Sequence, residues 1–141
     1  MARVDPYRAF RFRVEFDGIE HGGFARVKGM ARETKVDSYR EGGVNDHEHK
    51  FANITTFGNL VLERGLADDY LWWWHEQVIS GSQFKRRPIA VILHDETDQP
   101  VWRWLFERAF PVKWSGTDLD AVSSQMVVQS VEFAHHGFRR S

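Results

Sequence analysis

Hydrophobic and polar side chains alternate with a period of two along several stretches of the chain. In residues 10–16, the clearest stretch, three Phe and one Val are separated by two Arg and one Glu. Because successive side chains of a strand point to opposite faces, this pattern predicts a strand with one buried face. An Asp-Gly pair at 17–18 ends the stretch, and two glycines at 22–23 mark a further turn before a short strand at 24–27.

A long hairpin is predicted in the next part of the chain. Residues 34–39 are strand-like, and residues 59–63 carry Leu60 and Leu62 in alternation before the chain reaches a Gly. Between them, residues 45–50 are strongly polar and are predicted to form an exposed loop. The sequence therefore predicts a two-stranded hairpin over about residues 34–64, protruding from the fold.

One helix is predicted, over residues 68–80. The stretch starts at two Asp residues, ends before a Gly and contains neither Pro nor Gly, which suits a capped helix. Leu71 and Trp74 lie three residues apart on one apolar stripe. Trp72 and Trp73 cannot both share that stripe, so at least one of them is expected to point elsewhere.

The rest of the chain again reads as strands and turns. Residues 89–94 and 101–110 are predicted to form a second hairpin. Pro111 is expected to break the sheet or lie at its edge. Residues 115–118 are predicted to be a connection, and residues 122–134 the closing strand.

These elements predict a mainly β fold with six to eight strands. The economical architecture is two packed antiparallel sheets forming a barrel-like sandwich, with one flanking helix at about 68–80 and a protruding hairpin at about 34–64. The chain has 141 residues and no long linker or internal repeat. It is therefore expected to form a single domain over residues 1–141.

Composition excludes several functional classes. Nineteen basic and twenty acidic side chains give a net charge of −1, so no bulk positive charge favours nucleic acid or anionic membranes. The absence of Cys excludes disulfides and thiolate chemistry. The charged start lacks the apolar core of a signal peptide, and no window approaches the roughly 20 apolar residues of a membrane span. We therefore expect synthesis in the cytoplasm and no membrane-spanning segment.

Aromatic content is high, with six Trp and eleven Phe among the residues that bring aromatics to 14%. Each such side chain brings roughly 150–250 Å² of area to a core or an interface. The sequence thus predicts either a very aromatic core or an aromatic surface that meets a partner.

Histidines are the main candidates for a metal site. His47 and His49 are spaced as two ligands on a polar loop, and His135 and His136 form a second pair. Neither pair has an evident third ligand, so a solvated loop is favoured for His47 and His49. An enzyme that uses His47 and His49 with a metal remains an alternative.

Other chemical motifs are weak or missing. Phe84 stands beside a basic triplet at 85–87, which is more typical of a solvated connection than of nucleic-acid binding. The motifs GxSxG, GxGxxG and GxxxxGK[ST] do not occur. We therefore predict no catalytic residues, no cofactor and no metal, and a protein that is not an enzyme. A small-ligand-binding β-barrel remains an alternative.

An assembly role suits the remaining features. Exposed strand edges and an exposed apolar face are liabilities in a monomer, and neighbouring subunits can cover both. A ring built from one repeated contact does this for every subunit.

The sequence resembles the tail tube protein family of contractile phage tails and phage-tail-like contractile injection systems. The resemblance covers nearly the whole chain in order. It is carried by FRVEFDG at 12–18, GGF at 22–24, VKGM at 27–30, VDSYREGG at 36–43, NLVLERG at 59–65, LWWW at 71–74, PVKW at 111–114 and VEFAHHGF at 131–138.

This resemblance implies a structural protein whose hexameric rings stack into a rigid hollow tube inside a contractile sheath. Its expected partners are other copies of itself, the sheath protein, spike, hub or baseplate proteins, and cargo in the lumen, either effector protein or DNA. Such a protein is assembled into a phage tail or an injection particle. The expected contacts between subunits and rings come from the hairpin and the aromatic residues: Tyr39, Arg40, Glu41, Gly42, Gly43, His47, His49, Trp72, Trp73 and Phe84.

One segment departs from the family pattern. Family members often carry a Pro- or Gly-containing segment after the EGG, whereas residues 45–51 here are rich in His and charge. The departure leaves open a tube-initiating paralogue that joins the tube to the spike hub. The sequence also leaves open the nature of the cargo and which residues face the lumen.

Overall fold

The computed structural model describes residues 7–39, 49–81, 86–119 and 126–141. Within these ranges, no helix is long and apolar enough to cross a membrane. The elements in chain order are β1 (Phe12–Phe16), β2 (Ile19–Lys28), β3 (Arg32–Tyr39), β4 (His49–Phe57), β5 (Leu60–Ala67), α1 (Asp69–Ile79), β6 (Arg87–His94), β7 (Pro100–Leu119), β8 (Met126–Ala134) and β9 (Phe138–Arg140).

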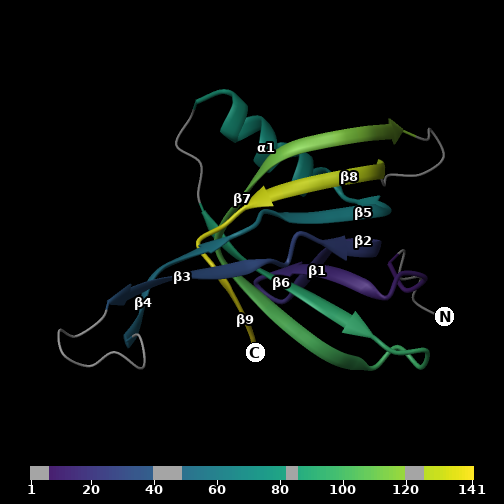
Figure 1. Ribbon diagram of the computed structural model, residues 1–141. Helices are drawn as coiled ribbons and strands as arrows, with labels where there is room; N and C mark the ends of the chain where they lie inside the picture. Colours follow the sequence, from purple (N-terminus) through teal and green to yellow (C-terminus); the bar gives the residue numbers. More distant parts are fainter. Residues whose placement is uncertain (1–6, 40–48, 82–85, 120–125) are drawn as a thin grey trace.

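The main body is an antiparallel sheet that closes on itself. Its strand order is β6-β1-β2-β5-β8-β7-β9, and an additional pairing of β6 with β7 closes the barrel. The long strand β7 makes this closure, because residues 100–109 pair with β6 and residues 110–119 pair with β8. Figure 1 shows β7 crossing from one wall of the body to the other. The predicted mainly β, barrel-like fold with one flanking helix is confirmed.

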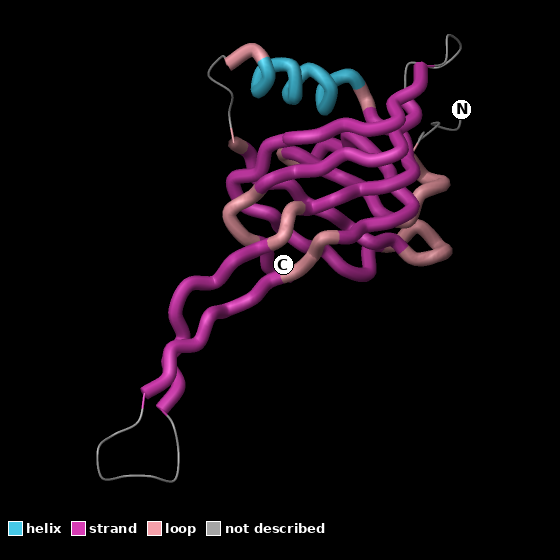
Figure 2. The backbone as a smooth tube through the Cα atoms, turned by 45° about the horizontal axis from the view of Figure 1, so that its top comes forward, coloured by secondary structure: helices cyan, strands magenta, loops and turns pink. Residues whose placement is uncertain are grey.

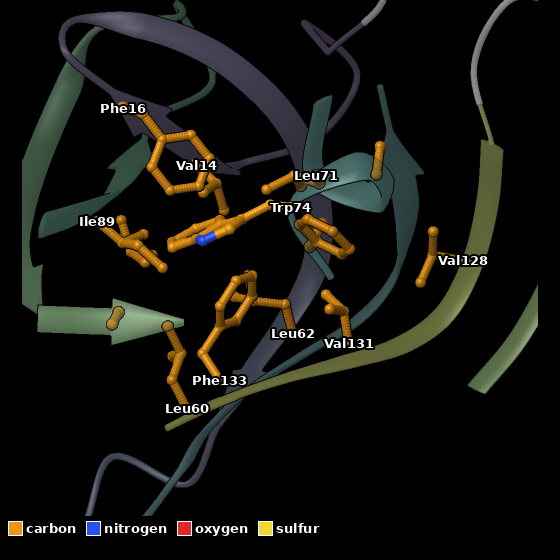
Figure 3. Close-up of a cluster of buried hydrophobic side chains, with 14 of the residues drawn as sticks. Val14, Phe16, Leu60, Leu62, Leu71, Trp74, Ile89, Val128, Val131 and Phe133 are labelled. Atoms are coloured by element: carbon orange, nitrogen blue, oxygen red, sulfur yellow. The ribbon is translucent and has the colours of Figure 1, made fainter. Parts of the chain in front are cut away.

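The core fills the interior of this barrel. Phe24, Phe106 and Phe133 are fully buried there together with many aliphatic side chains. The helix α1 lies against the barrel and inserts Leu71 and Trp74 into the same cluster (Figure 3). The predicted apolar stripe of the helix is therefore confirmed, and part of the aromatic surplus is used inside the fold.

The start of α1 is fixed by its cap. Asp68 is the N-cap residue, and its carboxylate accepts a hydrogen bond from the Leu71 backbone N–H at 3.3 Å. The same carboxylate lies 2.6 Å from Nδ1 of His21 on β2, and the Asp68 N–H donates to the His21 carbonyl. These bonds tie the first turn of α1 to the barrel.

The strands β3 and β4 form a separate two-stranded sheet that projects well away from the barrel (Figure 2). We call this sheet the hairpin. A protruding hairpin is confirmed, but the prediction that residues 59–63 form its second strand is wrong. The second strand is β4, whereas Leu60 and Leu62 lie on β5 and are fully buried in the barrel. Alternation predicts one buried face of a strand but does not name the pairing partner.

Two further predictions were wrong near the end of the chain. The sheet is not broken at Pro111, because β7 continues through a register shift between Pro111 and Lys113, and such irregularities tolerate Pro. Residues 115–118 belong to β7 rather than to a connection, and Gly116 there adopts a positive φ of 62°. The short strand β9 was not predicted, and the described part of the closing strand begins at Met126.

Candidate assembly surfaces

The hairpin exposes side chains on both of its faces. Between residues 32–38 and 50–56, every described side chain is exposed. Val36 pairs with Ala52, and Asp37 pairs with Phe51, so the two apolar side chains Val36 and Phe51 lie on opposite faces. Val36 is 56% exposed and Phe51 is 50% exposed. Neither face of the hairpin is buried against the barrel.

Local contacts within the hairpin are polar. The hydroxyls of Thr34 and Thr55 lie 2.8 Å apart, and Asn53 Nδ2 donates to Asp37 Oδ2 at 2.8 Å. Cross-strand pairs of this kind each contribute roughly 0.2–1 kcal/mol. An isolated two-stranded hairpin is marginally stable at best in water. The hairpin therefore gains most from being covered by another molecule.

The root of the hairpin is held by backbone bonds and close packing. The Gly58 N–H donates to the Ala31 carbonyl at 2.9 Å, which closes the two strands where they leave the barrel. Gly29 has a φ of +81°, and a side chain there would collide with the Asn59 carbonyl. The route out of the barrel is thus set by backbone positions that tolerate little change.

An aromatic cluster packs under this root. The ring of His135 lies 6.0 Å from the ring of Phe57 on β4 and 5.1 Å from the ring of the fully buried Phe106. Phe138 on β9 packs against Phe57 with a centroid distance of 5.8 Å, and the Arg32 guanidinium lies 5.5 Å from the Phe138 ring centroid. The cluster joins β3 and β4 to β7, to β9 and to the residue that directly follows β8.

The outer face of α1 is a second exposed aromatic surface. Trp72 and Trp73 are 37% and 49% exposed, and Ile79 near the helix end is 72% exposed. Trp72 is oriented by its indole N–H, which donates to Glu76 Oε1 at 2.8 Å, and its ring lies 5.3 Å from the ring of Trp114. Both Trp72 and Trp73 leave the core stripe, so the helix presents a preformed aromatic surface to solvent.

The structure describes four of the ten predicted contact residues, and these four lie in two separate places. Tyr39 and His49 form the last described backbone pair of the hairpin, and Trp72 and Trp73 lie on the exposed face of α1. The hairpin projects from the body at a distance from α1, so the structure does not bring these two groups together within one chain (Figure 2). Six predicted residues lie outside the described residues: Arg40, Glu41, Gly42, Gly43, His47 and Phe84.

Sequence reasoning missed other exposed apolar side chains on the barrel. Leu119 and Val127 lie near the described ends of β7 and β8 and are 79% and 44% exposed. Val101 and Trp102, near the start of β7, are 49% and 44% exposed. Two adjacent apolar residues, such as Val101 and Trp102, interrupt the alternation of apolar and polar side chains along a strand. This interruption is the sequence signal for an exposed apolar side chain, because adjacent side chains point to opposite faces.

Ionisable groups in the body are mostly paired with structural partners. The Arg13 guanidinium is buried. Although burial lowers its pKa, hydrogen bonds to Asp98 and Glu20 outweigh that effect and raise the pKa above its ordinary value. Burial lowers the pKa of His75 on α1, and a hydrogen bond to the backbone of Val112 acts in the opposite direction. Within the described ranges, no three His, Asp or Glu side chains are grouped to hold a metal ion.

Comparison with known proteins identifies the family of the chain. The sequence model of the family described as T4-like virus tail tube protein gp19 matches residues 8–139. A search of curated proteins found no significant match. Among solved structures, a chain in the cryo-EM structure of the anti-feeding prophage (AFP) baseplate, 6-fold symmetrised, has 28% sequence identity and a TM-score of 0.68. That alignment covers 100% of this chain and 96% of that chain.

Two further structures share the fold. A chain of the PVC sheath-tube complex, from an extracellular contractile injection system in the extended state, has 21% identity and a TM-score of 0.68, covering 94% of this chain and 88% of that one. Hcp1 from Flavobacterium johnsoniae has 12% identity and a TM-score of 0.51, covering 94% and 95% of the two chains. At these identities the likeness extends to the fold alone.

Proposed function

Because the chain belongs to the family of T4-like virus tail tube proteins, we propose that it forms hexameric rings that stack into a hollow tube. The family is structural and is not an enzyme family, and the protein is a tail tube-like component of contractile injection systems. The 6-fold symmetry named for the AFP baseplate supports a ring of six.

The single observation that carries this proposal is the uncovered hairpin. Val36 and Ile54 are 56% and 64% exposed on a two-stranded sheet whose described side chains at residues 32–38 and 50–56 are all exposed. A neighbouring copy that covers the hairpin supplies the packing that such a sheet lacks in water. Because the hairpin meets a different surface of its neighbour, the contact is heterologous, which generates rings or filaments rather than a closed dimer.

We propose contacts from the chain between β3 and β4 together with its flanking residues, from the outer face of α1 and from Phe84. They comprise these residues: Tyr39, Arg40, Glu41, Gly42, Gly43, His47, His49, Trp72, Trp73 and Phe84. Trp and Tyr are among the residue types that contribute most at the centre of an interface.

We propose further partners from the assemblies in which similar chains are found. The structures named above are a baseplate and a sheath-tube complex. The tube of this protein would run inside a contractile sheath, begin at a spike, hub or baseplate, and conduct effector protein or DNA through its lumen. On this proposal the chain acts as one tail-tube domain over residues 1–141, made in the cytoplasm and assembled into a phage tail or an injection particle.

A tube-initiating paralogue is the second candidate function. The AFP baseplate chain has the same fold, with 28% identity over the whole of this chain, which favours a position at the end of the tube. A ligand-binding barrel is less favoured, because Phe106, Phe133 and Trp74 occupy the interior of the barrel.

Negative-stain electron microscopy and sedimentation velocity of the purified chain test the proposal. We expect rings of one diameter, or tubes built from them. Ile54→Asp places a charge where a neighbouring copy is proposed to cover the hairpin, so this variant should remain monomeric. Ile54→Val keeps an apolar side chain at the same position and should assemble as the natural sequence does.

The form of the assembly separates the two candidate functions. Long tubes from the purified chain favour the tube protein. Single rings that extend only on added baseplate favour the initiator. Monomers at every concentration, with and without baseplate components, contradict both.

A further inference from the structure

The imidazole of His135 connects the root of the hairpin to the end of the barrel. Its Nε2 lies 2.8 Å from the Gly58 carbonyl oxygen, directly after β4, and its Nδ1 lies 3.0 Å from the backbone N of Gly137. A carbonyl oxygen only accepts a hydrogen bond and a backbone N–H only donates one. Nε2 must therefore carry the proton and Nδ1 must offer a lone pair, so the two bonds together require the neutral ring.

The second bond is lost when the ring is protonated. Imidazolium carries a proton on each nitrogen, so Nδ1–H would then face the Gly137 N–H, donor against donor. The Phe57 ring packs closely beside Gly137, because a Cβ there would lie 3.2 Å from Cζ of Phe57. The Gly137 carbonyl is also held, since it accepts from the Glu107 N–H at 2.9 Å. Relief of the clash therefore moves either the His135 ring or the Phe57 side chain, and both belong to the hairpin root.

Burial is the main influence on the charge of the ring. It lowers the pKa of His135, and the neighbouring His136 also lowers it, whereas the hydrogen bond to the Gly58 carbonyl acts in the opposite direction. Two carboxylates on the elements around the ring already have partners, because Glu107 Oε1 pairs with Arg139 Nε at 3.4 Å and Glu132 Oε2 accepts from Asn59 at 2.9 Å. The charged and titratable groups on the surrounding elements are Arg32, Glu33, Lys35, Asp37 and Tyr39 on β3, His49 and Lys50 on β4, Arg103, Glu107, Arg108, Lys113 and Asp118 on β7, Glu132 on β8, His136 before β9, and Arg139 and Arg140 on β9.

We propose that His135 is a positioning residue that fixes the direction in which the hairpin leaves the barrel, and that it acts only as the neutral imidazole. Acid then releases the hairpin from its set direction while the barrel remains folded. The consequence for assembly rests on the function proposed above: a hairpin with no set direction docks poorly on a neighbouring copy, so ring stacking weakens as the pH falls.

The hairpin direction can be measured within single molecules. The chain contains no Cys, so Lys50→Cys on the hairpin and Ser115→Cys on β7 provide two unique sites for donor and acceptor dyes. Both positions are exposed. Single-molecule energy transfer at roughly pH 8 should give one narrow distribution, and at about pH 5 a distribution about twofold broader. The midpoint of the change should lie below the ordinary His value of about 6.5.

Three variants separate positioning from simple stability. His135→Gln keeps an amide donor and an acceptor but does not titrate in this range, so its distribution should stay narrow at both pH values. His135→Leu removes both bonds and should be broad at both. His136→Gln, a change at the exposed neighbour, should behave as the natural sequence does. If His135→Gln is also broad at the higher pH, the amide does not replace the imidazole, and the positioning role of His135 is supported. The pH dependence is then judged from the natural sequence and from His136→Gln, which should both broaden in acid.

The proposal is overturned if the natural sequence gives the same distribution at both pH values, or if the acid broadening persists in His135→Gln. Pelleting of assembled material over the same pH range is the second measurement. Acid broadening without any assembly at either pH leaves the positioning role intact and contradicts the proposed function. If the energy-transfer distribution broadens in acid but the amount of pelleted material is unchanged, the positioning role stands. The claim that ring stacking depends on the hairpin direction is then contradicted.

Discussion

The barrel and the hairpin are both antiparallel β-structure, yet they bury their side chains very differently. In the barrel, the inward side chains of β5 and β8, such as Leu62 and Val131, are fully buried. In the hairpin, the described side chains of residues 32–38 and 50–56 are exposed on both faces. The barrel buries its apolar side chains within its own chain, whereas the hairpin leaves its apolar side chains exposed. Substitutions in the two regions should therefore separate folding from assembly.

The largest loss of stability is expected in the barrel core. Phe133→Ala removes a fully buried ring that packs against Trp74 at a centroid distance of 6.1 Å, and we expect the free energy of unfolding to fall by about 3–5 kcal/mol. Urea unfolding followed by tryptophan fluorescence measures this. Val127→Ala on the same strand, at a side chain 44% exposed, is the matched control and should cost about 0.5 kcal/mol or less. Equal losses in the two variants would show that the core is not where the structure places it.

An intermediate loss is expected at the start of α1. Asp68→Ala removes the cap of the Leu71 N–H and the contact with His21, which should lower the free energy of unfolding by about 1–2 kcal/mol. Thermal unfolding followed by circular dichroism measures the loss. Asp69→Ala changes the exposed neighbouring carboxylate in the first turn and should cost clearly less. The reverse order would contradict the assigned cap.

A smaller effect is expected from pH. Burial lowers the pKa of His75 in the folded state, so folding favours the neutral ring. The corresponding stability is fully present above the unfolded-state pKa of about 6.5 and is lost as the pH falls toward the folded-state pKa. Urea unfolding at a series of pH values should show a decline over this window that is shallower in His75→Gln. An unchanged slope in that variant would assign the decline to other groups.

The smallest change in stability, with the largest change in assembly, is expected in the hairpin. Replacing Val36 and Ile54 together by Ser removes two exposed apolar side chains, so the free energy of unfolding should change by about 0.5 kcal/mol or less. Pelletable assembly should fall by about tenfold or more, because apolar area at an interface is lost. Urea unfolding and pelleting on one preparation measure both. A stability loss as large as that of Phe133→Ala would show that the hairpin is part of the core.

Local rules predicted the elements whose signals lie within a few residues. The alternation of residues 10–16 matches β1, and the Asp pair and Gly that bound residues 68–80 match α1. Pairing was harder, because Leu60 and Leu62 show one buried face without showing that β5 pairs with β2 and β8. The region around Pro111 misled for a related reason: a bulge decides whether Pro fits within a strand, and no local signal marked one.

The candidate surfaces were predictable only in part. The Trp run on α1 could not share one stripe, and the structure exposes Trp72 and Trp73 while it buries Trp74. His135 was considered as a metal ligand in a pair with His136, and its place under the hairpin was not anticipated. That place depends on β4, β7, β8 and β9 meeting at one end of the barrel, which is a property of the topology rather than of the local sequence.

The length of β7 has a mechanical consequence. Its twenty residues run without interruption from the ladder with β6 to the ladder with β8. Tension applied to one of these ladders reaches the other through covalent backbone, with no loop between them to stretch. Pulling along the strand strains the many bonds of a ladder in shear at the same time, whereas pulling at a free edge opens them one by one. The backbone of β7 therefore couples the β6 side of the barrel directly to the β8 side.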